Sequence, residues 1–353
     1  MVMADTSDRQ GTGRPKRRRP PAMADVARLA GVSHQTVSRV INGSTRVAPE
    51  TRERVRDAMR LLEYRPNSVA RALVTGRSRT VGVIGFNTTL FGPASTLFGI
   101  ERSAHEADYL TSVVSMPEVD GESVLLAAER LRRHNVEGVL AMASHITAHG
   151  ALGQIAWEVP LVAVEAGPID GIPTVAIDQY GGAVSATRHL LELGHSCIAH
   201  IAGPSDSQEV QLRLAGYRET VLDAGHRPSP PLFGDWSPRS GYELGAQLAA
   251  RPEVTAIFVA NDQMALGALR ALDEAGRRVP DDVSIVGFDA IPEGEFFTPP
   301  LTTIRQDFIQ IGRRGFELLR RRIAEGESPA THQVIASELI VRASTGPPPA
   351  RGR

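Results

Sequence analysis

The chain has 353 residues, of which 42% are hydrophobic, so it is long enough for two or three domains with a sizeable core. Its one cysteine, Cys197, excludes an intrachain disulfide and cysteine-based zinc sites, and it favours a reducing, cytoplasmic compartment. No stretch is apolar for long enough to predict a membrane span or a signal peptide.

The net charge of −1 conceals a split between the two ends of the chain. Residues 1–78 hold 16 basic and 7 acidic residues, whereas the remainder holds 23 basic and 33 acidic residues. A basic head on an acidic body predicts that only the head contacts a polyanion. Residues 1–21 are expected to form a disordered basic tail, which either adds phosphate attraction or is only a solvated leader.

Residues 22–42 predict two short helices around a tight turn. Apolar residues recur at helical spacing on both sides of Gly31, which can end the first helix in the left-handed conformation. The Ser33 hydroxyl is placed to cap the second helix. The polar side chains that follow then face away from the helix contact, which is typical of a helix-turn-helix DNA-binding module, with an ordinary surface hairpin as the alternative.

A third helix is expected to begin at Pro49 and to close a three-helix core, so the predicted DNA-binding domain covers residues 22–66. Its apolar stripe includes Val55 and Ala58, and its other face carries four arginines. Residues 67–78 predict a hinge or linker. Its segment 68–74 is too short to hold as a helix in water, so it needs a surface to fold against.

Beyond Thr80, short apolar runs alternate with longer helical patterns. The runs cover residues 81–86, 110–116, 138–143, 161–165, 197–203, 256–260 and 283–289. Continuous apolar runs separated by helices predict parallel strands that are covered on both faces. We therefore expect an α/β core of two doubly wound parallel-sheet subdomains, with a ligand cleft beyond the carboxyl ends of the strands.

From about Met23 to Ser344 the chain resembles the lac repressor family of bacterial transcription regulators. The blocks that carry the resemblance are ADVARLAGVSHQTVSRVING, YRPNSVARALVTGRS, LRLAGY, GDWS, VANDQMALGALRAL, SIVGFD and PPLTTIRQDF. GDWS and SHQTVSRVIN resemble the namesake of the family more than its purine or ribose relatives. The resemblance implies a small all-α helix-turn-helix head, a hinge, and an allosteric, dimerising core of the periplasmic-binding-protein-like type I class.

The same resemblance sets the expected boundaries within the core, at residues 79–345. An N-subdomain would comprise about residues 79–177 and 308–335, and a C-subdomain about residues 178–305 and 336–345. Residues 346–353 would form a tail. Because Gly346 and three prolines occupy the place of the family's tetramerising apolar helix, we expect a homodimer.

In the head, His34, Gln35 and Arg39 match the family's base-reading positions. Gln can bond an adenine edge twice and Arg can fork onto guanine, each with roughly 1–3 kcal/mol of discrimination. His34 replaces a tyrosine of the namesake, so an identical operator is not expected. Leu73 matches a leucine that wedges into the minor groove and kinks the duplex, unless it only covers the head. The expected DNA-contacting set, phosphate contacts included, is Ser33, His34, Gln35, Thr36, Ser38, Arg39, Asn42 and Leu73.

In the core, the resemblance implies a sugar cleft. Carboxylate, amide and guanidinium groups bond vicinal hydroxyls, and a flat aromatic ring covers the apolar face of a sugar. Alternatively, Arg213 could pair with Glu209 and Trp236 could be core, while Asp262 is expected to cap the helix that follows it. The expected ligand-binding set is Leu90, Pro93, Glu165, Asp178, Arg213, Trp236, Asn261, Asp289 and Phe308.

Together these features predict a repressor of sugar-utilisation genes. It would bind a pseudo-palindromic double-stranded operator and be released by a sugar, with a galactoside as the first candidate. A ligand that promotes DNA binding, as in purine-type relatives, is the alternative.

Two other classes of protein remain to be weighed. A transport sugar-binding protein is opposed by the basic head and by the missing signal peptide. A sugar-processing enzyme, which would need a carboxylate pair, is opposed by the absence of a nucleophile motif, a phosphate loop or metal-ligand spacing. We expect a regulator without enzymatic activity, cofactor, metal or membrane contact.

Overall fold

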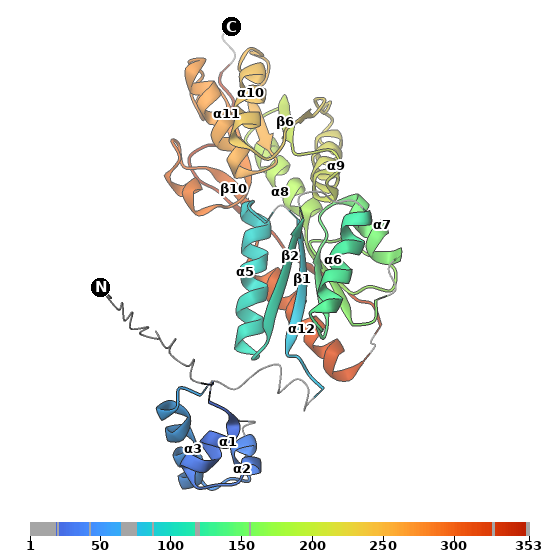
Figure 1. Cartoon of the computed structure of the whole chain (residues 1–353). Coiled ribbons are helices and arrows are strands. Elements are labelled where there is room, and N and C mark those ends of the chain that lie inside the picture. Colours follow the sequence, from blue (N-terminus) through green and yellow to red (C-terminus); the bar gives the residue numbers. More distant parts are fainter. Residues whose placement is uncertain are drawn as a thin grey trace, which may run out of the picture. The chain divides into compact units, whose positions relative to one another are not determined.

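The computed structural model describes residues 19, 21–41, 44–64, 76–86, 88–116, 121–154, 157–326 and 329–350. The chain divides into two compact units, residues 1–78 and residues 79–353 (Figure 1). Asn42, Leu73, the expected hinge helix and nearly all of the expected basic tail lie outside the described residues.

The described part of the head contains α1 (Met23–Ala30), α2 (His34–Ile41) and α3 (Pro49–Leu61). Val26, Val37 and Val55 are fully buried and form the centre of its core. Each comes from a different helix, so burying one valine requires the other two helices to be in place. The prediction of a small three-helix head is therefore confirmed.

The turn between α1 and α2 has the predicted geometry. Gly31 ends α1 in the left-handed conformation with a φ of 63°. The Ser33 hydroxyl accepts a hydrogen bond from the Thr36 N–H at 3.1 Å and so caps α2. One arginine of α3 differs from expectation, because Arg52 is half-buried and donates to the carbonyl of Ser44 at 3.1 Å. Arg52 thus holds the loop before α3 rather than only facing solvent.

The core contains two six-stranded sheets. The first has the order β11-β5-β4-β3-β1-β2, and its strand pairs are all parallel. Its strands are β1 (Thr80–Phe86), β2 (Leu110–Met116), β3 (Val139–Met142), β4 (Leu161–Val164), β5 (Thr174–Ile177) and β11 (His332–Ile335).

The second sheet has the order β12-β10-β9-β8-β6-β7 and is parallel except at β12, which pairs antiparallel with β10. Its strands are β6 (Ile198–Ala202), β7 (Leu232–Phe233), β8 (Ala256–Val259), β9 (Ser284–Asp289), β10 (Thr302–Arg305) and β12 (Glu338–Ile340). Each apolar run that predicted a strand coincides with one of these twelve strands to within two residues at either end.

Helices cover both faces of each sheet, as doubly wound architecture requires. Around the first sheet lie α5 (Phe91–Glu106) and α12 (Phe308–Glu325) on one face, and α6 (Gly121–Arg133) and α7 (Ile146–Gln154) on the other. Around the second lie α8 (Gln179–Glu192) and α9 (Gln208–Asp223) on one face, and α10 (Pro238–Ala249) and α11 (Asp262–Glu274) on the other. A short 3-10 helix, η1 (Pro292–Phe296), follows β9. The predicted fold class is confirmed.

The chain passes between the two sheets three times along its described residues, between β5 and α8, between β10 and α12, and between β11 and β12. These crossovers connect the subdomains and bound the space between them (Figure 1). Among the described residues, no helix has the length and apolar character needed to cross a membrane.

Candidate functional site

The start of α2 presents polar side chains on its outer surface. His34, Gln35 and Arg39 are exposed, whereas Val37 on the same helix is fully buried against α1 and α3. Thr36 and Ser38 are half-buried and flank them. An amide, an imidazole and a guanidinium on one exposed helix face are groups that can hydrogen bond to base edges in a major groove.

A second cluster of expected residues lies between the two subdomains, at the carboxyl ends of the strands. They line a cavity of about 60 Å³. All of the expected ligand-binding residues except Asp178 are part of its lining. The full lining is Leu90, Phe91, Gly92, Pro93, Ser144, His145, Glu165, Ser207, Glu209, Arg213, Trp236, Asn261, Gln263, Asp289 and Phe308.

Asp178 lies instead in a neighbouring pocket of about 210 Å³. Its carboxylate accepts a hydrogen bond from the Gly181 N–H at 2.7 Å and caps α8, which accounts for an acidic residue at this crossover. Glu165, Glu209 and Phe308 line both pockets. These three side chains therefore separate the two pockets.

Arg213 belongs to a ring of four side chains that are joined by three hydrogen bonds and one ion pair. Its Nε donates to Oε1 of Gln179 at 2.9 Å, and Nε2 of Gln179 donates to Oε1 of Gln306 at 2.8 Å. Nε2 of Gln306 then donates to Oδ1 of Asp289 at 2.6 Å, and that oxygen lies 3.9 Å from Nη2 of Arg213. Nη1 of Arg213 also donates to the carbonyl of Ala260. All four side chains of the ring are buried, so their mutual bonds replace those that water would make.

Aromatic rings enclose the same guanidinium. The Arg213 guanidinium carbon lies 3.9 Å from the ring centroid of Phe288 and 5.5 Å from that of Trp236. The indole of Trp236 packs against Gly203, where a Cβ would lie 2.5 Å from the ring. Trp236 is half-buried and lines the cavity, so it serves both the packing of the second sheet and the wall of the site.

The structure corrects the expected cap of α11. Asn261, not Asp262, is the capping residue, and its Oδ1 accepts from the Met264 N–H at 2.9 Å. Asp262 is fully buried and holds more distant segments, accepting from the Ile291 N–H at 2.9 Å and from the Thr303 hydroxyl at 2.7 Å. Burial raises the pKa of Asp262 to about 7. Asp262 is thus a structural cross-link and not a cap.

Three carboxyl groups converge on the cavity with a single arginine. Burial, reinforced by the charge of Glu209, raises the pKa of Glu165 to about 8, against a hydrogen bond from the Thr96 hydroxyl at 2.5 Å. Burial likewise raises the pKa of Glu209 and of Asp289, and the Arg213 charge opposes both shifts. At neutral pH a protonated Glu165 can donate a hydrogen bond, so the cleft offers both donors and acceptors to a polyhydroxylated ligand.

Backbone strain is concentrated in the cleft. Glu165, Trp236 and Asp289 have positive φ angles of 57°, 73° and 109°, although none of them is glycine. Conformations of this kind cost of order 1–3 kcal/mol each and persist where the surrounding structure holds them. Their presence at three lining residues is typical of a binding site that fixes side-chain directions.

The lining residues that sequence reasoning did not identify are Phe91, Gly92, Ser144, His145, Ser207, Glu209 and Gln263. Two features of the sequence could have identified Ser144, His145 and Glu209. Ser144 and His145 directly follow an apolar run that predicts a strand, where ligands gather in parallel sheets. Glu209 lies four residues before Arg213, on the same face of one helix.

Comparisons with known proteins agree with this two-part arrangement. Residues 22–67 match the model of "Bacterial regulatory proteins, lacI family", and residues 187–345 match that of a periplasmic binding protein-like domain. The chain is 35% identical over 330 residues to the lactose operon repressor of Escherichia coli (strain K12), covering 93% of this chain and 91% of that protein. It is 39% identical over 342 residues to the HTH-type transcriptional regulator CelR of Thermobifida fusca, covering 93% and 99%.

Solved structures extend the comparison. The crystal structure of the lac repressor dimer bound to operator and the anti-inducer ONPF matches with a TM-score of 0.84 at 33% identity, covering 93% of this chain and 100% of that one. The complex of the transcriptional regulator CelR with cellobiose matches with a TM-score of 0.69 at 35% identity, covering 92% and 99%. These relatives are regulators of transcription and not enzymes, as the sequence predicted.

Proposed function

Because this chain belongs to the lacI family, as a DNA-binding transcriptional repressor with a ligand-binding domain, we propose that it is a dimeric repressor released from its operator by a sugar. The observation that carries the proposal is the cavity between the subdomains, which Arg213, Asn261, Asp289 and Glu165 line together with a half-buried Trp236. This combination suits vicinal hydroxyls on one side and the apolar face of a sugar ring on the other.

The closed cavity of about 60 Å³ is smaller than the roughly 300–1,000 Å³ of typical ligand pockets. A sugar therefore needs the cleft to open. We expect the opening to occur at Glu165, Glu209 and Phe308, the side chains that separate the cavity from the neighbouring pocket. A ligand that joins the two neighbouring pockets would contact both subdomains. It would thereby favour one relative orientation of the subdomains over another.

A galactoside is our first candidate for the inducer. Cellobiose, the ligand named for the CelR complex, is the second, because that relative is 35% identical over most of the chain. A ligand that strengthens DNA binding is the alternative, and the direction of the ligand effect on DNA affinity separates the two cases.

For the DNA contact, we propose that α2 enters the major groove with Gln35 and Arg39 on base edges, His34 beside them, and Ser33, Thr36, Ser38 and Asn42 on the phosphates. Leu73 would wedge into the minor groove. The exposed face of α2 and the cap by Ser33 support this arrangement. A dimer would place two such helices on the two halves of a pseudo-palindromic operator.

For the dimer, the supporting observations are the similarity to the lac repressor dimer and the exposed apolar side chains in both subdomains. Phe98 on α5, Leu266 on α11 and Tyr242 on α10 are 53%, 43% and 39% exposed. Figure 1 shows α5 and α11 on the left-hand side of the core, and α6 and α7 on the right-hand side. A second copy of the chain that packs against α5 and α11 would cover exposed apolar side chains of both subdomains.

Two measurements test the proposal in sequence. Thermal-shift screening of the full chain against galactosides, cellobiose and free hexoses should find a sugar that stabilises it, because a ligand of the native state raises its apparent stability. Mobility shift on DNA from upstream of its own gene should then show a complex that the same sugar dissociates. A sugar that tightens the complex would reverse the sign of the proposal, and failure to bind any such fragment would refute it.

A further inference from the structure

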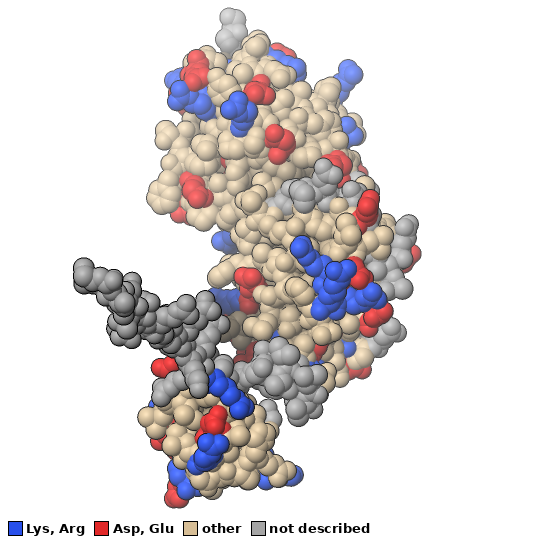
Figure 2. Space-filling view, viewed as in Figure 1, with Lys and Arg blue, Asp and Glu red and all other residues tan. Residues whose placement is uncertain are grey.

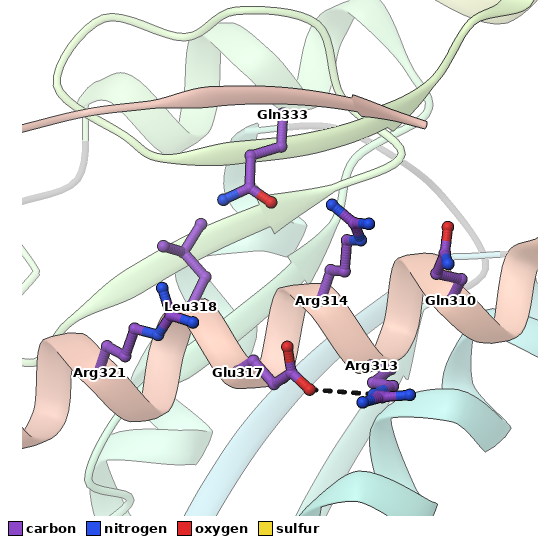
Figure 3. Close-up of a pocket in the computed structure, with 7 residues that line it drawn as sticks. All are labelled: Gln310, Arg313, Arg314, Glu317, Leu318, Arg321 and Gln333. Carbon is purple, nitrogen blue, oxygen red and sulfur yellow. Dashed lines mark hydrogen bonds and ion pairs between the residues drawn. The ribbon is translucent and has the colours of Figure 1, made fainter. Parts of the chain in front are cut away.

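A groove of about 490 Å³ lies between α12 and β11, the edge strand of the first sheet. It shares no lining residue with the cleft cavity. Gln310, Arg314 and Leu318 recur every four residues along α12 and point toward the sheet, and Gln333 points back at them from β11 (Figure 3). The groove is therefore built by two elements and not by one helix face alone.

The positive charge of this groove is only partly neutralised. Arg313 and Glu317 also line the groove, and Nε of Arg313 donates to Oε1 of Glu317 at 3.0 Å (Figure 3). Arg314 and Arg321 also line the groove and are exposed, and neither has a carboxylate partner among the residues that the structure describes. Two guanidinium groups thus remain available within one concave surface.

Another basic group on the core provides a contrast. Figure 2 shows blue side chains gathered over α6, whose last turn contains Arg130, Arg132 and Arg133. There Arg132 pairs with Glu129 at 2.8 Å and with Glu158 at 3.3 Å, and Arg133 pairs with Glu129 at 3.5 Å. The arginines over α6 are largely compensated by neighbouring acids, whereas those of the α12 groove are not.

We propose that the groove between α12 and β11 is a second ligand site, which binds the phosphate group of a small phosphate monoester. A phosphate monoester carries a charge of about −1.5 to −2 at neutral pH and three acceptor oxygens. Two guanidinium forks can each donate twice to such a group, and the Gln333 amide adds a further donor. A monocarboxylate would leave one guanidinium without a counter-charge.

The dimensions of the groove favour a phosphorylated organic molecule over free phosphate. Its volume of about 490 Å³ falls within the roughly 300–1,000 Å³ of ligand pockets and far exceeds what one phosphate fills. Leu318 supplies an apolar wall beside the two arginines. The carbon skeleton of the ligand would lie along this wall, with its phosphate between Arg314 and Arg321.

The placement of the site connects it to the cleft. α12 begins with Phe308, which lines the cleft cavity, and the groove begins at Gln310 on the same helix. Gln333 lies on β11, directly before the crossover to β12. A ligand that ties α12 to β11 would hold two of the three segments near the crossovers, so its binding can bias the orientation of the subdomains.

Isothermal titration of the full chain with glycerol 3-phosphate in low-salt buffer tests the proposal. The variants are Arg314→Gln and Arg321→Gln. The matched control is Arg320→Gln, an exposed arginine of the same helix outside the groove. We expect the wild type and the control to bind, and each groove variant to bind at least about tenfold more weakly, because each loses charge-assisted hydrogen bonds.

Three results would overturn it. They are no binding by the wild type at millimolar concentration, an equal loss in the Arg320→Gln control, and binding of succinate as tight as that of glycerol 3-phosphate. A fourth arm compares operator affinity without any added anion. If the groove variants weaken operator binding while the Arg320→Gln control does not, the groove serves DNA phosphates instead, and the small-ligand proposal fails.

Discussion

Glu165 is the cleft residue whose replacement should change how stability depends on pH. Its side chain is 8% exposed, and its Oε1 accepts a hydrogen bond from the Thr96 hydroxyl at 2.5 Å. Burial and the neighbouring charge of Glu209 raise the pKa of Glu165 to about 8. Glu165→Gln retains an acceptor for Thr96 and a similar volume, and it removes the titrating group.

The sign of the effect follows from the two states of the chain. In the unfolded chain this carboxyl has a pKa of 4.5, so below that pH both states hold the proton. Between 4.5 and about 8 the unfolded state has released its proton while the folded state keeps it, so the free energy of unfolding falls as pH rises. At about 1.36 kcal/mol per pKa unit the total loss is at most about 5 kcal/mol. Opening of the cleft to water reduces it.

Urea unfolding at fixed protein concentration, measured between about pH 5 and pH 8.5, provides the assay. We expect the wild type to lose stability relative to Glu165→Gln across this interval by at least about 1 kcal/mol. In Glu209→Gln, the loss of stability with rising pH should end at a lower pH than in the wild type. The reason is that this change removes the charge that helps to raise the pKa of Glu165. Glu101→Gln, which changes an exposed carboxylate on α5, is the control. Parallel curves for the wild type and Glu165→Gln would refute the reasoning.

Three further predictions address the head, the cleft and the dimer. Arg213→Ala should still bind the operator and should weaken sugar binding at least about tenfold, because charge-assisted hydrogen bonds are lost, as calorimetry and mobility shift would show. An Arg213→Ala variant that the sugar still releases from operator DNA as it releases the wild type would contradict this. Arg39→Ala should cost about 1–3 kcal/mol of operator binding by fluorescence anisotropy, with Arg28→Ala on α1 as the control. Equal effects of the two changes would argue against α2 as the reading helix. Leu266→Arg should yield monomers in sedimentation, whereas Leu126→Arg on the exposed side of α6 should not, and an intact dimer in both would exclude the α11 face.

Most of the strands that the sequence predicted are buried on both faces, which gives them continuous apolar runs. β4 and β8, for example, are buried at every position. The edge strands β7, β11 and β12 were not predicted, and neither were the interior strands β5 and β10, whereas the edge strand β2 was. β11 and β12 are largely exposed, and their sequences HQVI and ELI carry no apolar run. Their place in the sheets depends on partners far away in sequence, since β11 pairs with β5 and β12 with β10.

The cleft was predictable where a residue matches a family motif, as with Arg213 within α9 and Asp289 at the end of β9. The cleft was less predictable where two adjacent residues could each take the same structural role. Either Asn261 or Asp262 can cap a helix by chemistry, and the extended φ of −150° at Asn261 settles which of them does so. The importance of Glu209 depends on its approach to Glu165 across the cleft, which is a tertiary contact between segments that local pattern does not connect.

The ring that contains Arg213 gives a physical reason why a ligand in the cleft should change the hydrogen bonds at the crossovers between the subdomains. Gln179 begins α8 directly after the crossover from β5, and Gln306 lies within the crossover from β10 to α12. A sugar hydroxyl that bonds to Asp289 or Arg213 competes with bonds that hold these two glutamines. Each exchanged hydrogen bond changes the balance by about 0.5–1.5 kcal/mol, and couplings of about 1–3 kcal/mol suffice for a several-fold to hundredfold change in DNA affinity. One or two altered bonds in this ring are therefore enough to account for a regulatory response, without any large rearrangement inside either subdomain.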